Sequence, residues 1–234
     1  MAPDPSGLLM LFGAHHDDNE LNAGTIARHV RAGWKVVSVV MTDGRWVRGD
    51  VADAHVQMRN AESRAAARLL GIEPVFLGFT EGDLRPTPDM CRAVVRTMRA
   101  FRPDVVVTHP PKDYHNDHMA TSACVREAVY RCGNAAYECP EDPCPGPKLY
   151  WNDAWVLPFE PDLYVDVSEF VELKRQALGC HRSQLGPGGP GPGDMIDIEI
   201  SRARMRGFES GFAHAEAFRF VPRPGAVRTA GLLT

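Results

Sequence analysis

The sequence predicts an α/β protein with a Rossmann-like, mostly parallel sheet and helices on both faces. Short apolar runs rich in β-branched residues alternate with longer segments of helical periodicity as far as Cys132. This alternation is typical of parallel strands joined by helices. The chain has 234 residues, of which 44% are hydrophobic. Such a length and composition suit one domain that buries a real core.

Six strands are expected, four of them in the first half of the chain. The first four are short apolar runs at residues 8–12, 35–41, 74–77 and 104–108. Two more are expected at 150–157 and 163–167. In open α/β sheets, ligands bind beyond the carboxyl ends of the strands. A site is therefore expected in the segments that follow the first four strands.

Helices are expected between these strands. The apolar spacing predicts helices at 20–32, 56–70, 88–101 and 118–132, and glycine follows the first two closely, as a helix stop would. Ser168 is expected to cap a further helix that runs to about residue 179. A last amphipathic helix is expected at about 198–212, followed by an extended tail.

One domain is expected over residues 1–234, with loop insertions at about 133–149 and 186–193. The first insertion contains four prolines, and the second has the sequence GPGGPGPG. Both compositions disfavour regular structure. Cys132, Cys139 and Cys144 cluster in or beside the first insertion. The absence of any CxxC pair favours free thiols over a second metal site there.

Charge and the N-terminal sequence limit the partners and the location. A net charge of −4 argues against nucleic-acid binding, which normally requires a basic face. No window approaches the roughly 20 apolar residues that a membrane-spanning helix needs. The N-terminal segment has no basic region and only a short apolar run. The sequence therefore predicts a cytoplasmic protein without a membrane partner.

Two clusters of histidine and acidic residues follow the first and fourth predicted strands. The first reads AHHDDNE at 14–20, and the second reads HPPKDYHNDH at 109–118. Imidazole and carboxylate groups from two such loops suit a catalytic Zn²⁺, although two histidines and a carboxylate also bind non-haem iron. The alternative is that Asp17 or Asp18 only caps the first helix. The repetition at two strand ends favours a metal site.

These residues resemble the LmbE-like (PIG-L) family of N-acetylglucosaminyl deacetylases. HHDDNEL at 15–21 resembles the family motif AHPDD-x-E-[LI], and DYHNDH at 113–118 resembles D-Y-H-P-D-H. RNAE at 59–62 followed by LG, and KRQAL…HRSQ over 174–184, match two further motifs. The four motifs occur in order between about residues 8 and 184, so the resemblance is specific.

The resemblance implies a role for each matching residue of the metal and catalytic motifs. It implies that three residues bind zinc, namely His15, Asp18 and His118. Asp17 matches the general base, and His115 matches the histidine that stabilises the oxyanion and protonates the leaving amine. Asp117 matches the carboxylate that orients this histidine.

Substrate contacts are implied less directly. Arg59 and Asp83 lie where the family has substrate-binding groups, and Tyr114 is expected near the reacting carbonyl. Trp46, in a loop after a strand, is the tryptophan expected to stack on a sugar ring. His181 falls in the last motif without a defined role.

The sequence departs from the family at two positions. His16 and Asn116 replace prolines, which would stiffen the two loops. His16 is expected to point to the surface, with metal binding as its alternative.

The expected function is zinc-dependent hydrolysis of an N-acetyl or other N-acyl group from a small amino-sugar substrate. One alternative is a zinc amidase that acts on a thiol conjugate or another acyl amine. The other is a catalytically silent sugar-binding protein, although binding alone would need neither Asp17 nor His115. Because family members often assemble, the resemblance also implies a homo-oligomer.

Overall fold

A computed structural model describes residues 7–45, 52–153, 155, 157–186 and 193–222. Its centre is a sheet of seven strands in the order β3-β2-β1-β4-β5-β7-β6. The first five strands of this order are parallel, and β7 is antiparallel to both of its neighbours. The strands are β1 (Leu8–Gly13), β2 (Lys35–Thr42), β3 (Glu73–Phe79), β4 (Val105–Thr108), β5 (Lys148–Asn152), β6 (Leu163–Asp166) and β7 (Ala215–Val221).

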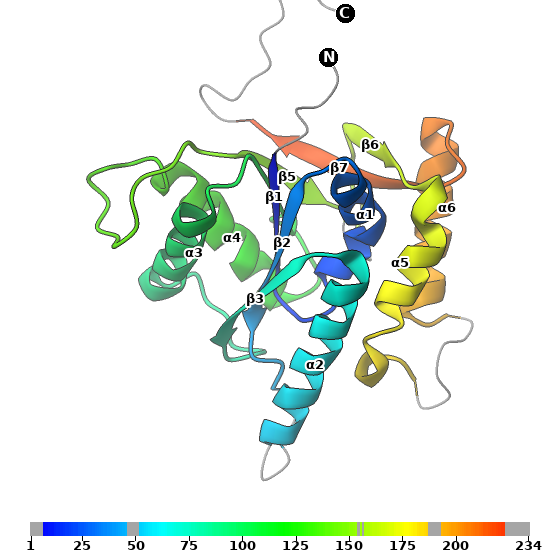
Figure 1. Ribbon diagram of the computed structural model, residues 1–234, viewed down its shortest axis with the longest axis horizontal. Helices are drawn as coiled ribbons and strands as arrows, with labels where there is room; N and C mark the ends of the chain where they lie inside the picture. The colour runs from blue at the N-terminus through cyan, green and yellow to red at the C-terminus, as the bar shows by residue number, and fades with distance from the viewer. Residues whose placement is uncertain (1–6, 46–51, 154, 156, 187–192, 223–234) are drawn as a thin grey trace, which may run out of the picture.

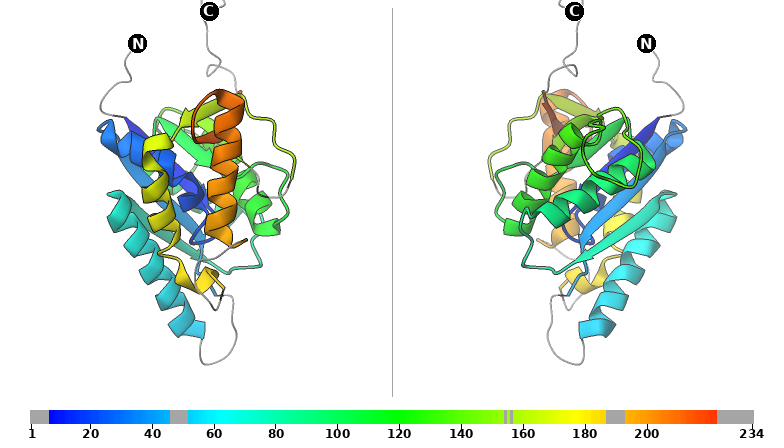
Figure 2. Two further views of the ribbon diagram at one scale, coloured as in Figure 1. Left: turned by 90° about the vertical axis from the view of Figure 1, so that its right-hand side faces the viewer. Right: turned by 90° about the vertical axis from the view of Figure 1, so that its left-hand side faces the viewer.

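Helices cover both faces of the sheet, which confirms the predicted fold class (Figure 1). α3 (Pro88–Phe101) and α4 (Asn116–Arg131) lie on one face. The other face carries α1 (Ala23–Arg31), α2 (Ala52–Leu70), α5 (Val171–Leu178) and α6 (Met195–Ser210). The two side views separate these groups clearly (Figure 2).

The apolar runs form the central strands because both of their faces are buried. Alternate residues of β1 point to opposite faces of the sheet. Met10 and Phe12 pack in a cluster with α3 and α4, whereas Leu9 and Leu11 pack in a second cluster that includes Ile26 of α1. A strand with two buried faces needs the nearly continuous apolar sequence seen here.

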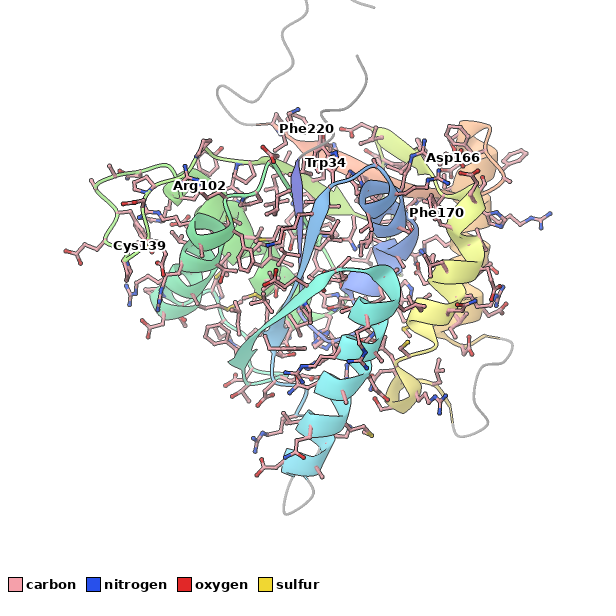
Figure 3. The ribbon with its side chains drawn as sticks, viewed as in Figure 1. Trp34, Arg102, Cys139, Asp166, Phe170 and Phe220 are labelled. Atoms are coloured by element: carbon pink, nitrogen blue, oxygen red, sulfur yellow. The ribbon has the colours of Figure 1, made fainter. Side chains whose placement is uncertain are left out.

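The pairing of β1 with β4 brings the two histidine-rich loops together. Phe12 of β1 lies beside Thr108 of β4 in a parallel register. The segments that begin at Ala14 and His109 therefore leave the sheet at the same edge. Trp34 lies at the opposite edge, where the strands begin (Figure 3).

Several element boundaries differ from the prediction. The first helix is preceded by a 3-10 turn, η1 (Asn19–Asn22), so the α-helix begins at Ala23. The second helix begins earlier, at Ala52, and β5 ends earlier, at Asn152. The last helix spans Met195–Ser210 rather than 198–212.

One prediction near the C-terminus was wrong, and a second was incomplete. Ser168 does not cap α5, because it begins a separate 3-10 turn, η2 (Ser168–Phe170), and its hydroxyl donates to Asp166. The expected extended tail contains β7, which pairs with β5 and β6. The mostly apolar, aromatic-rich run AEAFRFV was the available signal for this strand.

Residues 133–147 connect α4 to β5 without a helix or strand. Cys132 and Cys144 are buried in the apolar cluster beneath this connection, and their thiols donate to backbone carbonyls. Cys139 lies further out on the same segment, where its thiol bonds with Glu141 (Figure 3). The three cysteines thus have separate partners, and all six cysteines are free thiols. Most of the second predicted insertion lies outside the described residues.

Candidate metal centre and active site

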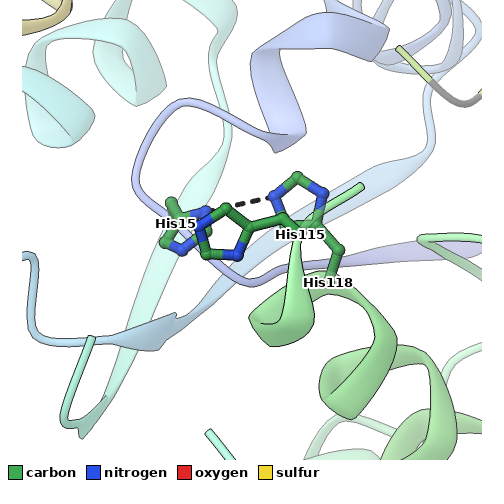
Figure 4. Close-up of side chains that lie close together, drawn as sticks. All are labelled: His15, His115 and His118. Atoms are coloured by element: carbon green, nitrogen blue, oxygen red, sulfur yellow. Dashed lines mark hydrogen bonds between the residues drawn. The ribbon is translucent and has the colours of Figure 1, made fainter. Parts of the chain in front are cut away.

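The three predicted metal ligands meet at the carboxyl edge of the sheet. His15 follows β1, Asp18 precedes η1, and His118 lies in the first turn of α4. All three side chains are buried, with exposed fractions of 10% or less. Figure 4 shows His15 and His118 approaching one another, with His115 beside them.

The distances between their ligand atoms fit a metal ion. Nδ1 of His15 lies 3.1 Å from Nε2 of His118 and 3.4 Å from Oδ2 of Asp18. Nε2 of His118 lies 3.4 Å from Oδ1 of Asp18. With metal–ligand distances of about 2.0–2.2 Å, the ligand atoms of a tetrahedral zinc site lie about 3.4 Å apart. The three side chains therefore stand at the spacing that zinc requires.

Two further carboxylates hold the histidines in the orientation that a metal needs. Asp117 Oδ2 lies 3.3 Å from Nε2 of His15, and Asp113 Oδ1 lies 2.9 Å from Nδ1 of His118. Each histidine can donate its outer N–H to a carboxylate and keep the lone pair of its inner nitrogen. This arrangement is the usual support of metal-binding histidines.

The electrostatics of the cluster favour a cation. Burial lowers the pKa of His15 and of His118, but Asp18 and the flanking carboxylates raise them to about 10 and about 9. The pKa of Asp18 is held well below its usual value, because the nearby histidines outweigh the effect of burial. The carboxylates therefore favour positive charge at the two rings, which protons or a metal ion would supply.

Two more histidines adjoin the cluster. His109 and His115 each offer a nitrogen within 4.8 Å of the ligand atoms in one of two candidate donor sets, Asp18–His109–His118 and His15–His115–His118. Nε2 of His109 accepts a hydrogen bond from the backbone N–H of Ala14, so its lone pair is already engaged. This contact favours His15 over His109 as a ligand. Sequence reasoning gave His109 no role, although it begins the second cluster of histidine and acidic residues.

Asp17 stands beside the cluster at an open cavity. The guanidinium of Arg59, which is only 1% exposed, donates to Asp17 Oδ1 over 3.1 Å and lies 4.0 Å from Glu81. The cavity has a volume of about 810 Å³ including its open mouth. It is lined by His15, Asp17, Asp18, Arg59, Glu81, Tyr114, His115, His118, Trp155, Gln184 and Met195.

The structure places Asp117 differently from the role that the resemblance implies. Its carboxylate accepts hydrogen bonds from the backbone N–H groups of Gly82 and Leu84 and contacts His15 rather than His115. His115 is instead oriented through the backbone, because its Nδ1 accepts from the N–H of Asp117 at the start of α4. Burial and the neighbouring histidines lower the pKa of His115.

Only some of the predicted substrate-binding residues line the cavity. Arg59 and Tyr114 line the cavity, whereas Asp83 is 74% exposed and pairs with Arg85 outside it. Glu81, two residues earlier in the same loop, lines the cavity instead. Trp46 lies outside the described residues. Trp155, for which the sequence analysis gave no role, lines the cavity.

His16 and His181 lie apart from the metal cluster. His16 is buried rather than exposed: it bonds with Asn60 and stacks on Phe76. The prediction that it points to the surface was therefore wrong. His181 is fully buried, and its Nε2 lies 3.5 Å from Glu20.

The chain is thus an α/β protein with a Rossmann-like sheet and a buried His/Asp cluster at the carboxyl edge that could hold a metal ion. The chain belongs to the PIG-L family, whose model, described as GlcNAc-PI de-N-acetylase, matches residues 10–129. The matched segment contains all the residues of the cluster. No helix among the described residues is long and apolar enough to cross a membrane.

Comparisons with known proteins agree on this family. The chain is 28% identical to the diacetylchitobiose deacetylase of Thermococcus kodakarensis, over 89% of this chain and 80% of that protein. It is 33% identical to the mycothiol S-conjugate amidase of Streptomyces coelicolor, over 77% and 83% of the two chains.

Two solved structures have the same fold over nearly the whole chain. The conserved protein TT1542 of Thermus thermophilus superposes with a TM-score of 0.81 at 27% identity, over 97% of this chain and 98% of that one. A 4-carboxy-2-hydroxymuconate hydratase of Pseudomonas putida superposes with a TM-score of 0.80 at 22% identity, over 96% and 100%. The second match concerns the fold alone, so function must be argued from the site.

Proposed function

We propose that the protein is a zinc-dependent amide hydrolase that removes the N-acetyl group of a small amino-sugar substrate. The observation that carries this proposal is the convergence of two carboxylate-supported histidines and Asp18 beside a further carboxylate, Asp17, which Arg59 holds at the cavity. The relatives that act on acetylated amino sugars support the choice of substrate.

His15, Asp18 and His118 are the proposed ligands. When bound, Zn²⁺ supplies the positive charge that makes water more acidic and the amide carbonyl more electrophilic. The same ligand types suit non-haem iron. We propose zinc because amide hydrolysis needs a Lewis acid and no redox change.

The remaining side chains supply the proton transfers. Asp17, held by Arg59, accepts a proton from the attacking water. His115 donates a proton to the leaving nitrogen, so that an amine departs instead of an unstable anion. Tyr114, whose pKa is raised by burial and by nearby carboxylates, keeps its hydroxyl proton and can donate to the carbonyl oxygen.

The test combines metal analysis with amine release from N-acetylglucosamine and N-acetylated glycosides. We expect about one metal ion per chain in the wild type. Asp17→Asn should keep the metal and lose about 10²–10⁴ in rate, the usual contribution of a general base. His118→Ala should lose the metal. Asp89→Asn, an exposed change on α3, is the matched control and should resemble the wild type.

Each alternative has its own result. Bound metal without release of any amine would favour a silent binding protein. Cleavage of thiol-conjugate amides in place of acetylated sugars would favour the amidase. A wild-type protein that binds no added zinc would overturn the proposal. Cytoplasmic location and self-association stay predictions.

A further inference from the structure

Two cysteines face each other between α3 and α4. Cys91 lies near the start of α3, and Cys124 lies in the middle of α4. Their sulfur atoms are 2.7 Å apart. An S–S bond is about 2.05 Å long, and it forms without backbone movement only where the two side chains already point toward each other. This pair meets that condition, so a bond between the sulfurs needs only a small shift.

The fold itself holds the two helices at this spacing. α3 and α4 lie side by side on one face of the sheet (Figure 1). The guanidinium of Arg99 in α3 is buried and donates to the backbone carbonyls of Arg131 and Cys132 at the end of α4. Apolar side chains of both helices complete the contact. The approach of the sulfur atoms is therefore set by the packing of the helices.

The two thiols differ in the way that a reactive pair requires. Cys91 is partly exposed, whereas Cys124 is fully buried in the apolar cluster. The hydrogen bond between them lowers the pKa of the Cys91 thiol and raises the pKa of the Cys124 thiol. The thiolate is the form of cysteine that attacks an oxidant. Cys91 is thus the reactive member of the pair, and Cys124 is the neighbour that can trap its oxidised form.

The other four cysteines have different surroundings. Cys132 and Cys144 are buried, and their thiols donate to backbone carbonyls. Burial raises the pKa of the Cys139 thiol and of the Cys180 thiol, so less of either is ionised at neutral pH. Accessible thiols with a lowered pKa are the ones that oxidants reach first. Oxidation is therefore expected to begin at Cys91.

We propose that Cys91 and Cys124 form a reversible disulfide bond when the protein meets a peroxide. The Cys91 thiolate attacks one peroxide oxygen, the O–O bond breaks, and hydroxide leaves and takes up the proton of Cys91 to form water. The sulfur of Cys124 then attacks the sulfenic acid at Cys91, and the displaced hydroxyl group leaves as water with the proton of Cys124. Two thiols and one hydrogen peroxide thus give one disulfide and two waters. Such transient disulfides are the kind found in reducing compartments.

The disulfide would join two parts of the frame around the metal cluster. α4 carries Asp117 and His118 in its first turn, and α3 follows the loop whose backbone N–H groups bind Asp117. The two cysteines are 33 positions apart in the sequence. A cross-link over such a segment restricts the unfolded chain and stabilises the folded one. The oxidised protein is therefore expected to unfold at a higher temperature than the reduced protein.

The experiment treats the fully reduced protein with one equivalent of hydrogen peroxide. Of its six thiols, the wild type should lose two, and its mass should fall by two hydrogen atoms. Digestion without a reductant should yield one pair of peptides joined through Cys91 and Cys124. The midpoint of thermal unfolding should rise by about 5–10 °C. Dithiothreitol should reverse all of these changes.

Two variants separate this pair from general thiol oxidation. Cys91→Ser, at a partly exposed position, should keep all of its thiols and its unfolding midpoint under the same treatment. Cys180→Ser is the matched control, because Cys180 is also partly exposed but lies after α5. It should still lose two thiols and show the same rise in the midpoint as the wild type.

The peptide map of the wild type decides the question even if a variant fails to fold. A cross-link between any other two cysteines would overturn the proposal. Recovery of Cys91 as a thiol, or as a sulfenic or sulfinic acid without a bond to Cys124, would overturn it as well. Thiol counts and unfolding do not depend on amide hydrolysis, so either result leaves the proposed function to its own test.

Discussion

At the residue scale, the buried side chain of Asp117 links a proposed metal ligand to a neighbouring loop. Its exposed fraction is 0%, and its two oxygens bind His15 and the loop that leads from β3 to α3. Burial alone would raise its pKa, but the hydrogen bonds from His15, Gly82 and Leu84 lower it below the usual value. The carboxylate thus stays charged and fixes the ring of a proposed metal ligand.

Asp117→Asn should therefore weaken metal binding. Loss of such a supporting carboxylate typically costs about 10- to 100-fold in metal affinity. Competition with a chelator of known zinc affinity would measure the change in zinc affinity. Asp83→Asn is the matched control, because that side chain is exposed outside the cavity. Unchanged affinity in Asp117→Asn would show that the contact with His15 does not support the metal.

His29 predicts a pH effect far from the metal cluster. Burial lowers its pKa, although its ring donates to the carbonyl of Thr25. Above the unfolded pKa of about 6.5, both states are neutral. Below it, the unfolded chain binds a proton that the folded chain does not, so stability falls until the lower folded pKa is passed.

His29→Phe removes the titrating imidazole, so neither state binds a proton at this position, and it keeps an aromatic contact with Trp34. The loss of stability between pH 7.5 and 5.5 should become smaller than in the wild type. Urea unfolding at the two pH values measures it. An identical loss in both proteins would contradict the assignment.

At the scale of elements, a buried ion network joins α5, α6, β7 and α1. Lys174 of α5 is 1% exposed and contacts Glu216 of β7 at 2.9 Å and Glu199 of α6 at 3.3 Å. Glu216 also accepts from the backbone N–H groups of Gly24 and Thr25 at the start of α1. A carboxylate at a helix N-terminus stabilises the helix.

Lys174→Met should destabilise the fold by about 3–5 kcal/mol, because two carboxylates stay buried without their cation. Lys35→Met, which breaks an exposed pair with Glu73, should cost less than about 1 kcal/mol. Denaturant unfolding of both variants tests the difference. Equal losses would mean that the buried network does not stabilise the protein.

Gly24 marks the closest approach between α1 and the end of β6. A Cβ atom there would lie 2.6 Å from Cβ of Val167 and 3.0 Å from Oε1 of Glu216. Gly24→Ala should therefore cost about 1–3 kcal/mol, although alanine favours a helix. Gly186→Ala should be neutral, because no atom of the described residues would lie within 4 Å of the added Cβ. Thermal unfolding of both variants measures the change in stability. If Gly24→Ala is more stable than the wild type, the tight packing at Gly24 is contradicted.

At the scale of the whole molecule, the sequence predicted the sheet and the cluster well because both depend on local patterns. Continuous apolar runs identify buried parallel strands, and the motifs placed seven site residues around one cavity. The sequence could not show that Glu81 rather than Asp83 lines it, since the turn at Gly82, with a φ of 79°, decides which acid faces inward. The pairing of Asp117 with His15 also depends on tertiary packing.

The predicted homo-oligomer has a candidate surface on the C-terminal half of α6 and the turn that follows it. Met205, Phe208 and Phe212 are 52%, 90% and 43% exposed, and apolar groups gathered in this way often mark an interface. We expect Phe208→Lys to lower the mass measured by sedimentation. A wild-type monomer, or an oligomer unaffected by the change, would contradict this surface.

The hydrogen bonds that Glu216 accepts at the start of α1 have a consequence for how the protein folds during its synthesis on the ribosome. Synthesis proceeds from the N-terminus, and early segments begin to fold first. Yet the helix that follows the first metal-binding loop receives its terminal carboxylate from the last strand, 192 residues after Gly24. In the nascent chain, α1 therefore lacks these two hydrogen bonds until β7 has left the exit tunnel of the ribosome.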